Sequence, residues 1–182
     1  MPNVMLDVET LGTSPGCIIL SIGAVYFDKE QLGEEFYTVI NKSSSIYYNM
    51  AEEPRTVLWW EKQNEAAREV LSQAVESKVT VQAALHNFSY FIRSLNFKDI
   101  CIWGNGSDFD NVLLQAYYEA LLEPTPWDSH KNNRCYRTLK SLFPGIPIIK
   151  QGVVHNALDD AKSQALHAIT LLAQLNKGDI YA

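Results

Sequence analysis

The stretch "VMLDVETLG" (residues 4–12) decides how this chain is interpreted. Its apolar residues predict a buried strand, yet it carries two carboxylates, Asp7 and Glu9. Side chains alternate between the two faces of a strand, so residues 7 and 9 point the same way. Neighbouring like charges repel each other and are costly to remove from water. Either this face is open to water, or something positive lies between the two carboxylates.

Length and composition are those of an ordinary globular protein. The 182 residues suffice for one domain with a proper core, and 47% of them are hydrophobic. The longest apolar runs fall short of the roughly 18 residues that span a bilayer, and the first residues lack a signal-peptide pattern. The three cysteines are widely spaced without a C-x-x-C pattern, which predicts free thiols. We therefore expect a cytoplasmic protein with no membrane segment.

The net charge of −6 argues against passive coating of nucleic acid by a basic surface. It is compatible with an enzyme that binds a polyanion through metal ions, because the metals supply positive charge locally. The charge is also uneven, since Lys131 to Lys150 holds five basic residues and no acidic one.

The order of expected elements predicts an α/β fold, with a mixed β-sheet flanked by α-helices in a single domain, residues 1–182. Close-spaced strands with short turns open the chain and predict an antiparallel meander. Apolar periodicity, caps and turn residues define the remaining elements. The expected strands are 3–9, 17–27, 34–40 and 99–106, and the expected helices are 54–75, 80–95, 107–122, 133–143 and 156–175.

Acidic residues occur in three pairs at similar places, on the first strand, after the fourth strand and at the start of the last helix. The pairs are Asp7 with Glu9, Asp108 with Asp110, and Asp159 with Asp160. Strand ends and helix starts converge on sites in α/β folds, and four carboxylates can hold two divalent cations, Mg²⁺ or Mn²⁺. The alternative is that acids near a helix start are simple caps. The acid pair on the strand fits that alternative less well, because strand interiors are depleted in acids.

Three motifs resemble those of the DnaQ-like 3′–5′ exonucleases, in the DEDDh branch. "DVET" matches the D-x-E motif, and "NGSDFDNVLL" resembles the second motif with its aromatic–aspartate pair. "HNALDDA" matches H-x-A-x-x-D, with His155 five residues before Asp160. The motifs follow the family order over about the whole chain. The resemblance implies an RNase H-like fold.

The resemblance also implies a mechanism. Asp7, Glu9, Asp110 and Asp160 would hold two divalent cations, and His155 would be the general base. Glu9 would also orient the attacking water. Asp110 follows the aromatic residue, so we expect it to be the ligand rather than Asp108. The helical wheel places Asp160 nearer the apolar face than Asp159, which we expect to face solvent. The products would be nucleoside 5′-monophosphates.

A closer resemblance is to the exonuclease-VIII-like and RNase-AS-like proteins of phages and bacteria. It rests on "DVETLGT", "SIGAV", "WW..Q" and "WGNG..FDN.LL". Members act on single-stranded or 3′-protruding nucleic acid, RNA or DNA, and dimers are common among them, so a homodimer is an open alternative. Thr10 and Leu11 would meet the terminal nucleotide.

Two further features are candidate substrate contacts. Trp59 and Trp60 can stack on bases or anchor a helix, and we expect one to be buried and the other at the rim of the site. Arg134 and Arg137 can share a face that guides the phosphate backbone, or belong to a solvated surface.

The sequence thus predicts a metal-dependent 3′–5′ exonuclease that acts on nucleic acid with a free 3′ end. One alternative is a catalytically inactive module of the same fold that binds nucleic acid or protein. Another is a small-molecule phosphohydrolase, which would turn over nucleotides and ignore polymers.

Overall fold

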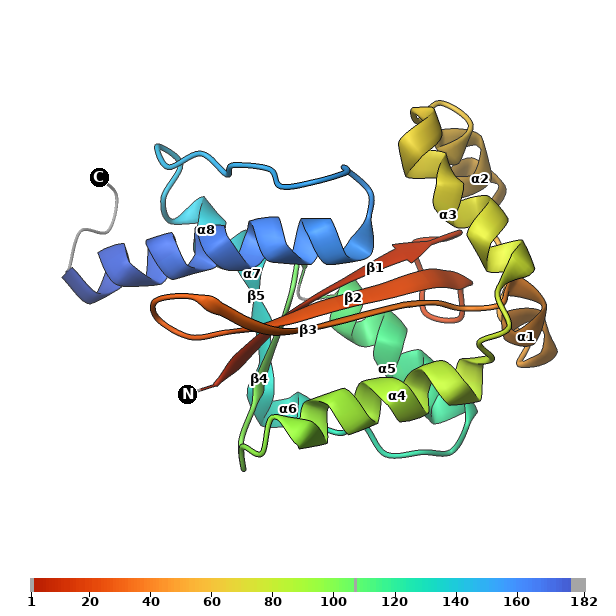
Figure 1. Ribbon diagram of the computed structural model, residues 1–182, viewed down its shortest axis with the longest axis horizontal. Coiled ribbons are helices and arrows are strands. Elements are labelled where there is room, and N and C mark those ends of the chain that lie inside the picture. The colour runs from red at the N-terminus through yellow and green to blue at the C-terminus, as the bar shows by residue number, and fades with distance from the viewer. Residues whose placement is uncertain (1, 107, 178–182) are drawn as a thin grey trace.

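The computed structural model describes residues 2–106 and 108–177. Within these ranges, five strands form one mixed sheet in the order β3-β2-β1-β4-β5 (Figure 1). The first three strands pair antiparallel, whereas β4 runs parallel to β1 and β5 runs parallel to β4. The strands are β1 (Asn3–Thr10), β2 (Ile19–Phe27), β3 (Leu32–Val39), β4 (Cys101–Gly104) and β5 (Asn133–Cys135).

Helices cover both faces of this sheet (Figure 1). The long helix α8 lies over one face, while α4 and α5 lie against the other. The helices of the described residues are α1 (Lys42–Tyr47), α2 (Pro54–Trp60), α3 (Glu65–Glu76), α4 (Val81–Ser94), α5 (Asp110–Ala120), α6 (Ser129–Asn132), α7 (Tyr136–Ser141) and α8 (Ala157–Lys177). The mixed sheet flanked by helices is the predicted fold.

The strand β1 lies in the middle of the sheet, and its side chains alternate between the two apolar clusters on either face. Leu6 and Val8 point into the apolar cluster beneath α4 and α5. Met5 points to the opposite face, where Ala161 and Ala165 of α8 pack closely. Asp7 and Glu9 continue the Met5 face, so the acid pair lies on the side that α8 covers.

Several expected elements differ from the observed ones. The expected helix 54–75 is two helices, because Asn64 caps α3 by accepting the backbone N–H of Ala67 at 2.9 Å. The expected helix 133–143 starts as the edge strand β5, which pairs with β4. The expected helix 107–122 begins at Asp110, and its residue 107 lies outside the described residues.

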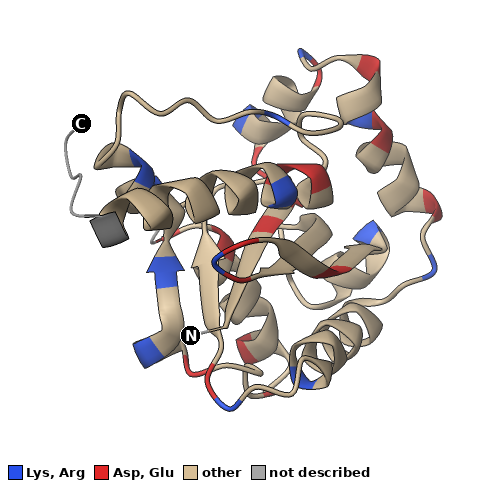
Figure 2. Ribbon diagram, turned by 60° about the vertical axis from the view of Figure 1, so that its left-hand side comes forward, with Lys and Arg blue, Asp and Glu red and all other residues tan. Residues whose placement is uncertain are grey.

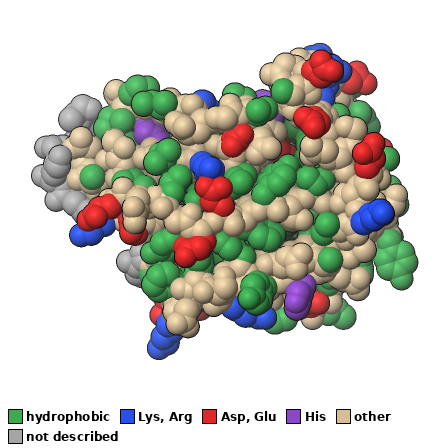
Figure 3. Space-filling model, viewed as in Figure 1, with side chains coloured by type: hydrophobic (Ala, Val, Ile, Leu, Met, Phe, Trp, Pro, Cys, Tyr) green, Lys and Arg blue, Asp and Glu red, His purple; other side chains and the backbone are tan. Residues whose placement is uncertain are grey.

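The surface agrees with the acidic composition. On the face shown in Figure 3, Lys and Arg side chains are scattered among acidic and hydrophobic ones and form no broad basic patch. Cys17, Cys101 and Cys135 all lie in described segments and are free thiols, as predicted. Across residues 2–106 and 108–177, every helix is too short or too polar to cross a lipid bilayer.

Candidate active site

Four carboxylates lie together in one cavity of about 500 Å³. Asp7 and Glu9 come from β1, Asp110 begins α5, and Asp160 lies in the first turn of α8. Their exposed fractions are only 2–8%. Figure 2 shows acidic segments where the central strands meet the start of α8. We call these four residues the acidic floor.

A glycine allows α8 to approach the sheet closely enough to complete the floor. Gly23 on β2 lies opposite Asp7 in the β1–β2 register. A Cβ at this position would overlap the backbone of Ala157 and Leu158, so only glycine leaves the necessary space. The helix therefore starts directly on the strand pair, which brings Asp160 beside the acid pair of β1.

Backbone donors fix Asp110 in the floor. Its Oδ1 accepts the N–H of Val8 at 3.2 Å, and its Oδ2 accepts the N–H of Asn105 at 2.6 Å. Because β4 runs parallel to β1, the end of β4 delivers this aspartate to the end of β1. Asp108 is exposed. Asp159 differs from expectation, since it is half-buried and accepts an N–H of the preceding loop.

The crowded carboxylates perturb one another. Burial, followed by the charges of Asp110, Glu9 and Asp160, raises the pKa of Asp7 well above its ordinary value. Burial and the charges of Asp160 and Asp110 raise the pKa of Glu9 to about 8, although the charge of Lys150 opposes the shift. Burial raises the pKa of Asp110 to about 6, although its backbone donors oppose the shift. The floor therefore favours a bound positive charge between its carboxylates. Of the two explanations for the acid pair on β1, this supports the one in which something positive lies between Asp7 and Glu9.

The structure adds two residues that the motifs did not identify. Gln164 donates its Nε2 to Asp7 Oδ1 at 2.7 Å, and its buried Oε1 finds no hydrogen-bond partner within the described residues. Lys150 places its Nζ 2.5 Å from Asp160 Oδ1. Gln164 follows Asp160 by one helical turn, so the i,i+4 spacing could have identified it. Lys150 ends the basic stretch of residues 131–150, but no motif indicates its contact with Asp160, because it lies in a loop.

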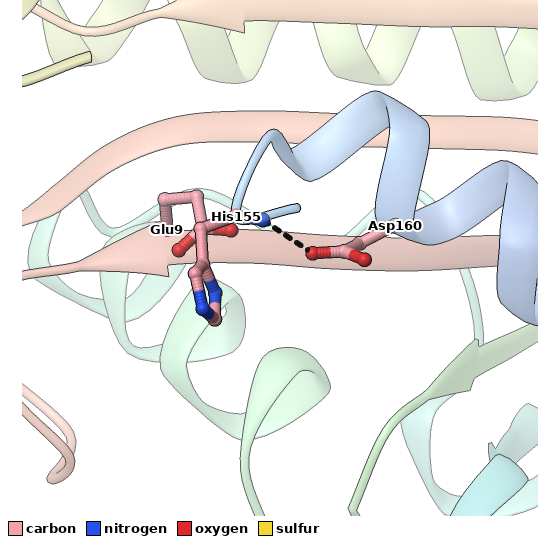
Figure 4. Close-up of side chains that lie close together, drawn as sticks. All are labelled: Glu9, His155 and Asp160. Carbon is pink, nitrogen blue, oxygen red and sulfur yellow. Dashed lines mark hydrogen bonds between the residues drawn. The ribbon is translucent and has the colours of Figure 1, made fainter. Parts of the chain in front are cut away.

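His155 lies beside the floor (Figure 4). Its backbone N–H donates to Asp160 Oδ2 at 2.9 Å, drawn as the dashed line. Ligand atoms of Glu9, His155 and Asp160 all lie within 4.8 Å of one another. Burial lowers the pKa of His155, against the opposing charge of Asp160, so the imidazole is mostly neutral near pH 7. A neutral imidazole at this position can accept a proton or bind a metal.

The two tryptophans of α2 divide as expected. Trp60 is buried and donates its Nε1 to the carbonyl of Thr10 at 2.8 Å. Trp59 is 41% exposed at the rim, and its ring lies edge-on to His155 with centroids 4.8 Å apart. Thr10 lines the cavity, whereas Leu11 is buried in the core. The structure thus brings Thr10, Trp59 and the buried Trp60 to the lining of the cavity, but not Leu11.

The basic residues are divided between cavities. Arg137 lines the cavity of the acidic floor, together with Arg55 from α2, which the sequence analysis did not single out. Arg134 donates its Nη1 to the carbonyls of Lys131 and Asn133 at 2.7 and 2.9 Å and lines a separate cavity. The two arginines of the basic stretch therefore do not share one face.

Comparison with known families shows which family the chain belongs to. A family model described as the 3′–5′ exoribonuclease Rv2179c-like domain matches residues 2–172. The chain belongs to the Rv2179c-like family. This membership confirms the resemblance to 3′–5′ exonucleases, while the narrower subgroup stays a prediction. No curated protein matches the chain.

Solved structures share the fold of this Rv2179c-like domain. One is the nuclease domain of 3′hExo, described as a DEDDh family member bound to rAMP, with a TM-score of 0.63 and 13% identity over 98% of this chain and 94% of that chain. Another is exonuclease X in complex with 5′ overhanging duplex DNA, with a TM-score of 0.61 and 15% identity over 96% and 93%. At these identities the likeness concerns the fold, and it confirms the predicted RNase H-like exonuclease architecture.

Proposed function

We propose that this chain is a metal-dependent 3′–5′ exonuclease that hydrolyses single-stranded or 3′-protruding nucleic acid to nucleoside 5′-monophosphates. The observation that carries the proposal is the acidic floor, which gathers four buried carboxylates beside His155 in one cavity. Membership in a 3′–5′ exoribonuclease-like family supports the same reaction. A protein that only binds nucleic acid has no need for five such groups in one place.

The residues of the floor fit two divalent cations, Mg²⁺ or Mn²⁺. The floor supplies carboxylate oxygens, the ligands that these hard cations prefer, and it is too crowded to stay fully ionised without positive charge. The Oε1 of Gln164, which has no hydrogen-bond partner among the residues that the structure describes, offers a further oxygen at the cavity. When bound, such cations activate water and stabilise the leaving oxygen of a phosphodiester. Asp7, Glu9, Asp110 and Asp160 would hold them.

His155 is proposed as the general base. Its lowered pKa favours the neutral form that accepts a proton from water near pH 7. Glu9, whose carboxylate lies close to this imidazole, is proposed to orient the water. The Trp59 ring packs edge-on against the imidazole. His155 and Glu9 would act together on the water that attacks the phosphate.

The rim of the cavity is proposed to bind the polymer. Arg55 and Arg137 are exposed cations that suit phosphates, and Trp59 offers an exposed ring for stacking on a base. Thr10 would meet the terminal nucleotide, whereas Leu11 is buried in the core and does not line the cavity, so we do not propose this contact for Leu11. Trp60 also lines the cavity and is proposed to act through the Thr10 carbonyl that it holds. Arg134 lines a separate cavity, so the expected contact of its side chain with the polymer at this site is not supported.

Other aspects of the proposal rest on the sequence. We propose that residues 1–182 form a single exonuclease domain, which the family match over residues 2–172 supports. RNA is the favoured polymer by the family description, and DNA stays an alternative because discrimination depends on contacts to the 2′-hydroxyl. A cytoplasmic location and a homodimer stay predictions.

A time course with 5′-labelled RNA and DNA of one sequence tests the function. The wild type is compared with Asp110→Asn and with the control Asp108→Asn, in Mg²⁺, Mn²⁺ or EDTA. We expect ladders that shorten from the 3′ end and vanish with EDTA and with Asp110→Asn, while the control keeps its activity. Binding of both polymers without cleavage in any metal would refute the proposal and favour the binding module.

A further inference from the structure

The loop between α7 and α8 delivers two functional groups to the cavity. Residues 150–155 begin with Lys150 and end with His155, and both side chains line the cavity of the acidic floor. The loop has no regular secondary structure of its own. Its shape must therefore come from contacts with neighbouring elements, because an unheld loop would let both groups drift.

Side chains at the start of α8 accept hydrogen bonds from every second backbone N–H of this loop. Each bond joins a loop amide to a side-chain oxygen of the first two turns of α8. The bonds are Gln151 to Ser163 Oγ at 2.8 Å, Val153 to Asp159 Oδ2 at 2.8 Å, and His155 to Asp160 Oδ2 at 2.9 Å.

The loop follows a sharp path around the Asp159 carboxylate. Gly152 and His155 both adopt left-handed backbone, with φ of 61° and 65°. A Cβ on Gly152 would overlap the carboxylate of Asp159, so the glycine permits the close approach. Left-handed backbone is costly for a residue such as histidine and persists only when the surroundings hold it. Asp159 provides one of these stabilising contacts, because its carboxylate accepts the N–H of Val153, two residues before His155.

Asp159 has no direct place in the site. It does not line the cavity of the acidic floor, and one of its carboxylate oxygens accepts the Val153 N–H. The neighbouring Asp160 belongs to the floor, and its Oδ2 also accepts the N–H of His155. Asp160 therefore contributes to the proposed metal site, whereas Asp159 contacts the loop through Val153. This division explains why two aspartates stand side by side in "HNALDDA".

We propose that Asp159 is a positioning residue that keeps the His155 imidazole in the cavity, an inference that rests on the proposed function. Its carboxylate fixes residues 152–154, and this segment sets the backbone direction at His155. The proposal concerns the hydrogen bond to Val153 and not the negative charge. An asparagine Oδ1 can accept the same N–H, so the amide variant should keep the role.

Steady-state kinetics on single-stranded RNA separate this role from a general loss of fold. We expect Asp159→Ala to lower kcat by about 10- to 100-fold with KM within about twofold, because small misplacements of a catalytic group cost that much. Asp159→Asn should stay within about threefold of the wild type. Loss of charge at the start of α8 would affect both variants equally, so the rescue by asparagine isolates the hydrogen bond.

Two measurements without substrate complete the test. Amide hydrogen exchange at Val153 should accelerate in Asp159→Ala and return to the wild-type rate in Asp159→Asn. Mn²⁺ affinity should stay unchanged in both variants, because Asp160 is intact. Unchanged exchange, a weakened Mn²⁺ affinity, or kcat that is either unaffected by alanine or not rescued by asparagine would each overturn the proposal. A wild type that cleaves no polymer would instead refute the proposed function itself.

Discussion

The acidic floor and the rim of the same cavity are built in different ways. The floor lies on β1 and on the first turns of α5 and α8, and its carboxylates are almost fully buried. The rim, which we define as Arg55, Trp59 and Arg137, consists of exposed side chains on α2 and α7. The fold therefore fixes the groups proposed for chemistry, whereas solvent-accessible side chains are available for substrate choice. Changes in the floor should affect kcat, and changes in the rim should affect KM.

The largest effect is expected in the floor. Asp7→Asn keeps an oxygen that can accept from Gln164 Nε2, so the fold should persist while a charged ligand is lost. We expect kcat on RNA to fall at least about 1000-fold, or about 4 kcal/mol in barrier height. Circular dichroism controls for folding. Activity within tenfold of the wild type would remove Asp7 from the chemistry.

The stability of the metal-free protein should depend on pH through Glu9. Its pKa of about 8 in the folded state exceeds the ordinary 4.5, so the folded protein retains a proton that the unfolded chain releases. Stability in EDTA should therefore fall as the pH rises from about 4.5 to 8. Glu9→Gln, which cannot ionise, should be more stable than the wild type at pH 8 by up to about 4 kcal/mol in urea unfolding.

The surface residue Glu34 provides the matched control for this comparison. Glu34→Gln should follow the wild-type pH dependence. Added Mg²⁺ should reduce the difference between the wild type and Glu9→Gln, because cations favour the ionised floor. An equal loss of stability with pH in both the wild type and Glu9→Gln would show that burial of Glu9 has no such consequence.

At the rim, Trp59→Ala should raise KM by about tenfold and leave kcat nearly unchanged, since stacking on a base is worth about 1–3 kcal/mol. The neighbouring Leu58 is 55% exposed and does not line the cavity, so Leu58→Ala is the control. A fall in kcat without a change in KM would move Trp59 from the rim to the chemistry, through its contact with His155.

The smallest effect concerns Lys150, which lines the same cavity but belongs to neither the floor nor the rim. Its side chain is 45% exposed, yet its ammonium contacts Asp160 in the floor. Because this cation competes for a proposed metal ligand, Lys150→Met should bind Mn²⁺ about two- to fivefold more tightly in calorimetry. Lys140→Met, an exposed lysine on α7, should bind as the wild type does. Weaker Mn²⁺ binding by Lys150→Met would contradict the competition.

The floor could be predicted from the sequence because each of its residues lies at a recognisable local position. Asp7 and Glu9 interrupt an apolar strand, and Asp110 and Asp160 lie at helix starts in ordered motifs. The contacts of Lys150 could not be predicted, since a loop residue ten positions before Asp160 reaches it only through tertiary folding. The part played by Gly23 in admitting α8 is likewise a tertiary effect.

The fold shows the same division between local and tertiary information. The central strand and the long amphipathic helix α8 follow from periodicity. The edge strand β5 has only three residues and exists because β4 offers a pairing partner. The short helix α1 begins where Asn41 accepts the N–H of Ser44, in a polar stretch without helical periodicity. The sequence pattern therefore predicted the long elements and missed the shortest ones.

The most direct test of the central claim is to locate Mn²⁺ by anomalous scattering in crystals of the protein with a nucleoside 5′-monophosphate. The account predicts two anomalous peaks that contact the carboxylates of Asp7, Glu9, Asp110 and Asp160, with the phosphate beside them. Asp110→Asn crystals treated identically should lose at least one peak. Wild-type crystals without Mn²⁺ at the acidic floor, with the nucleotide bound elsewhere, would contradict the account.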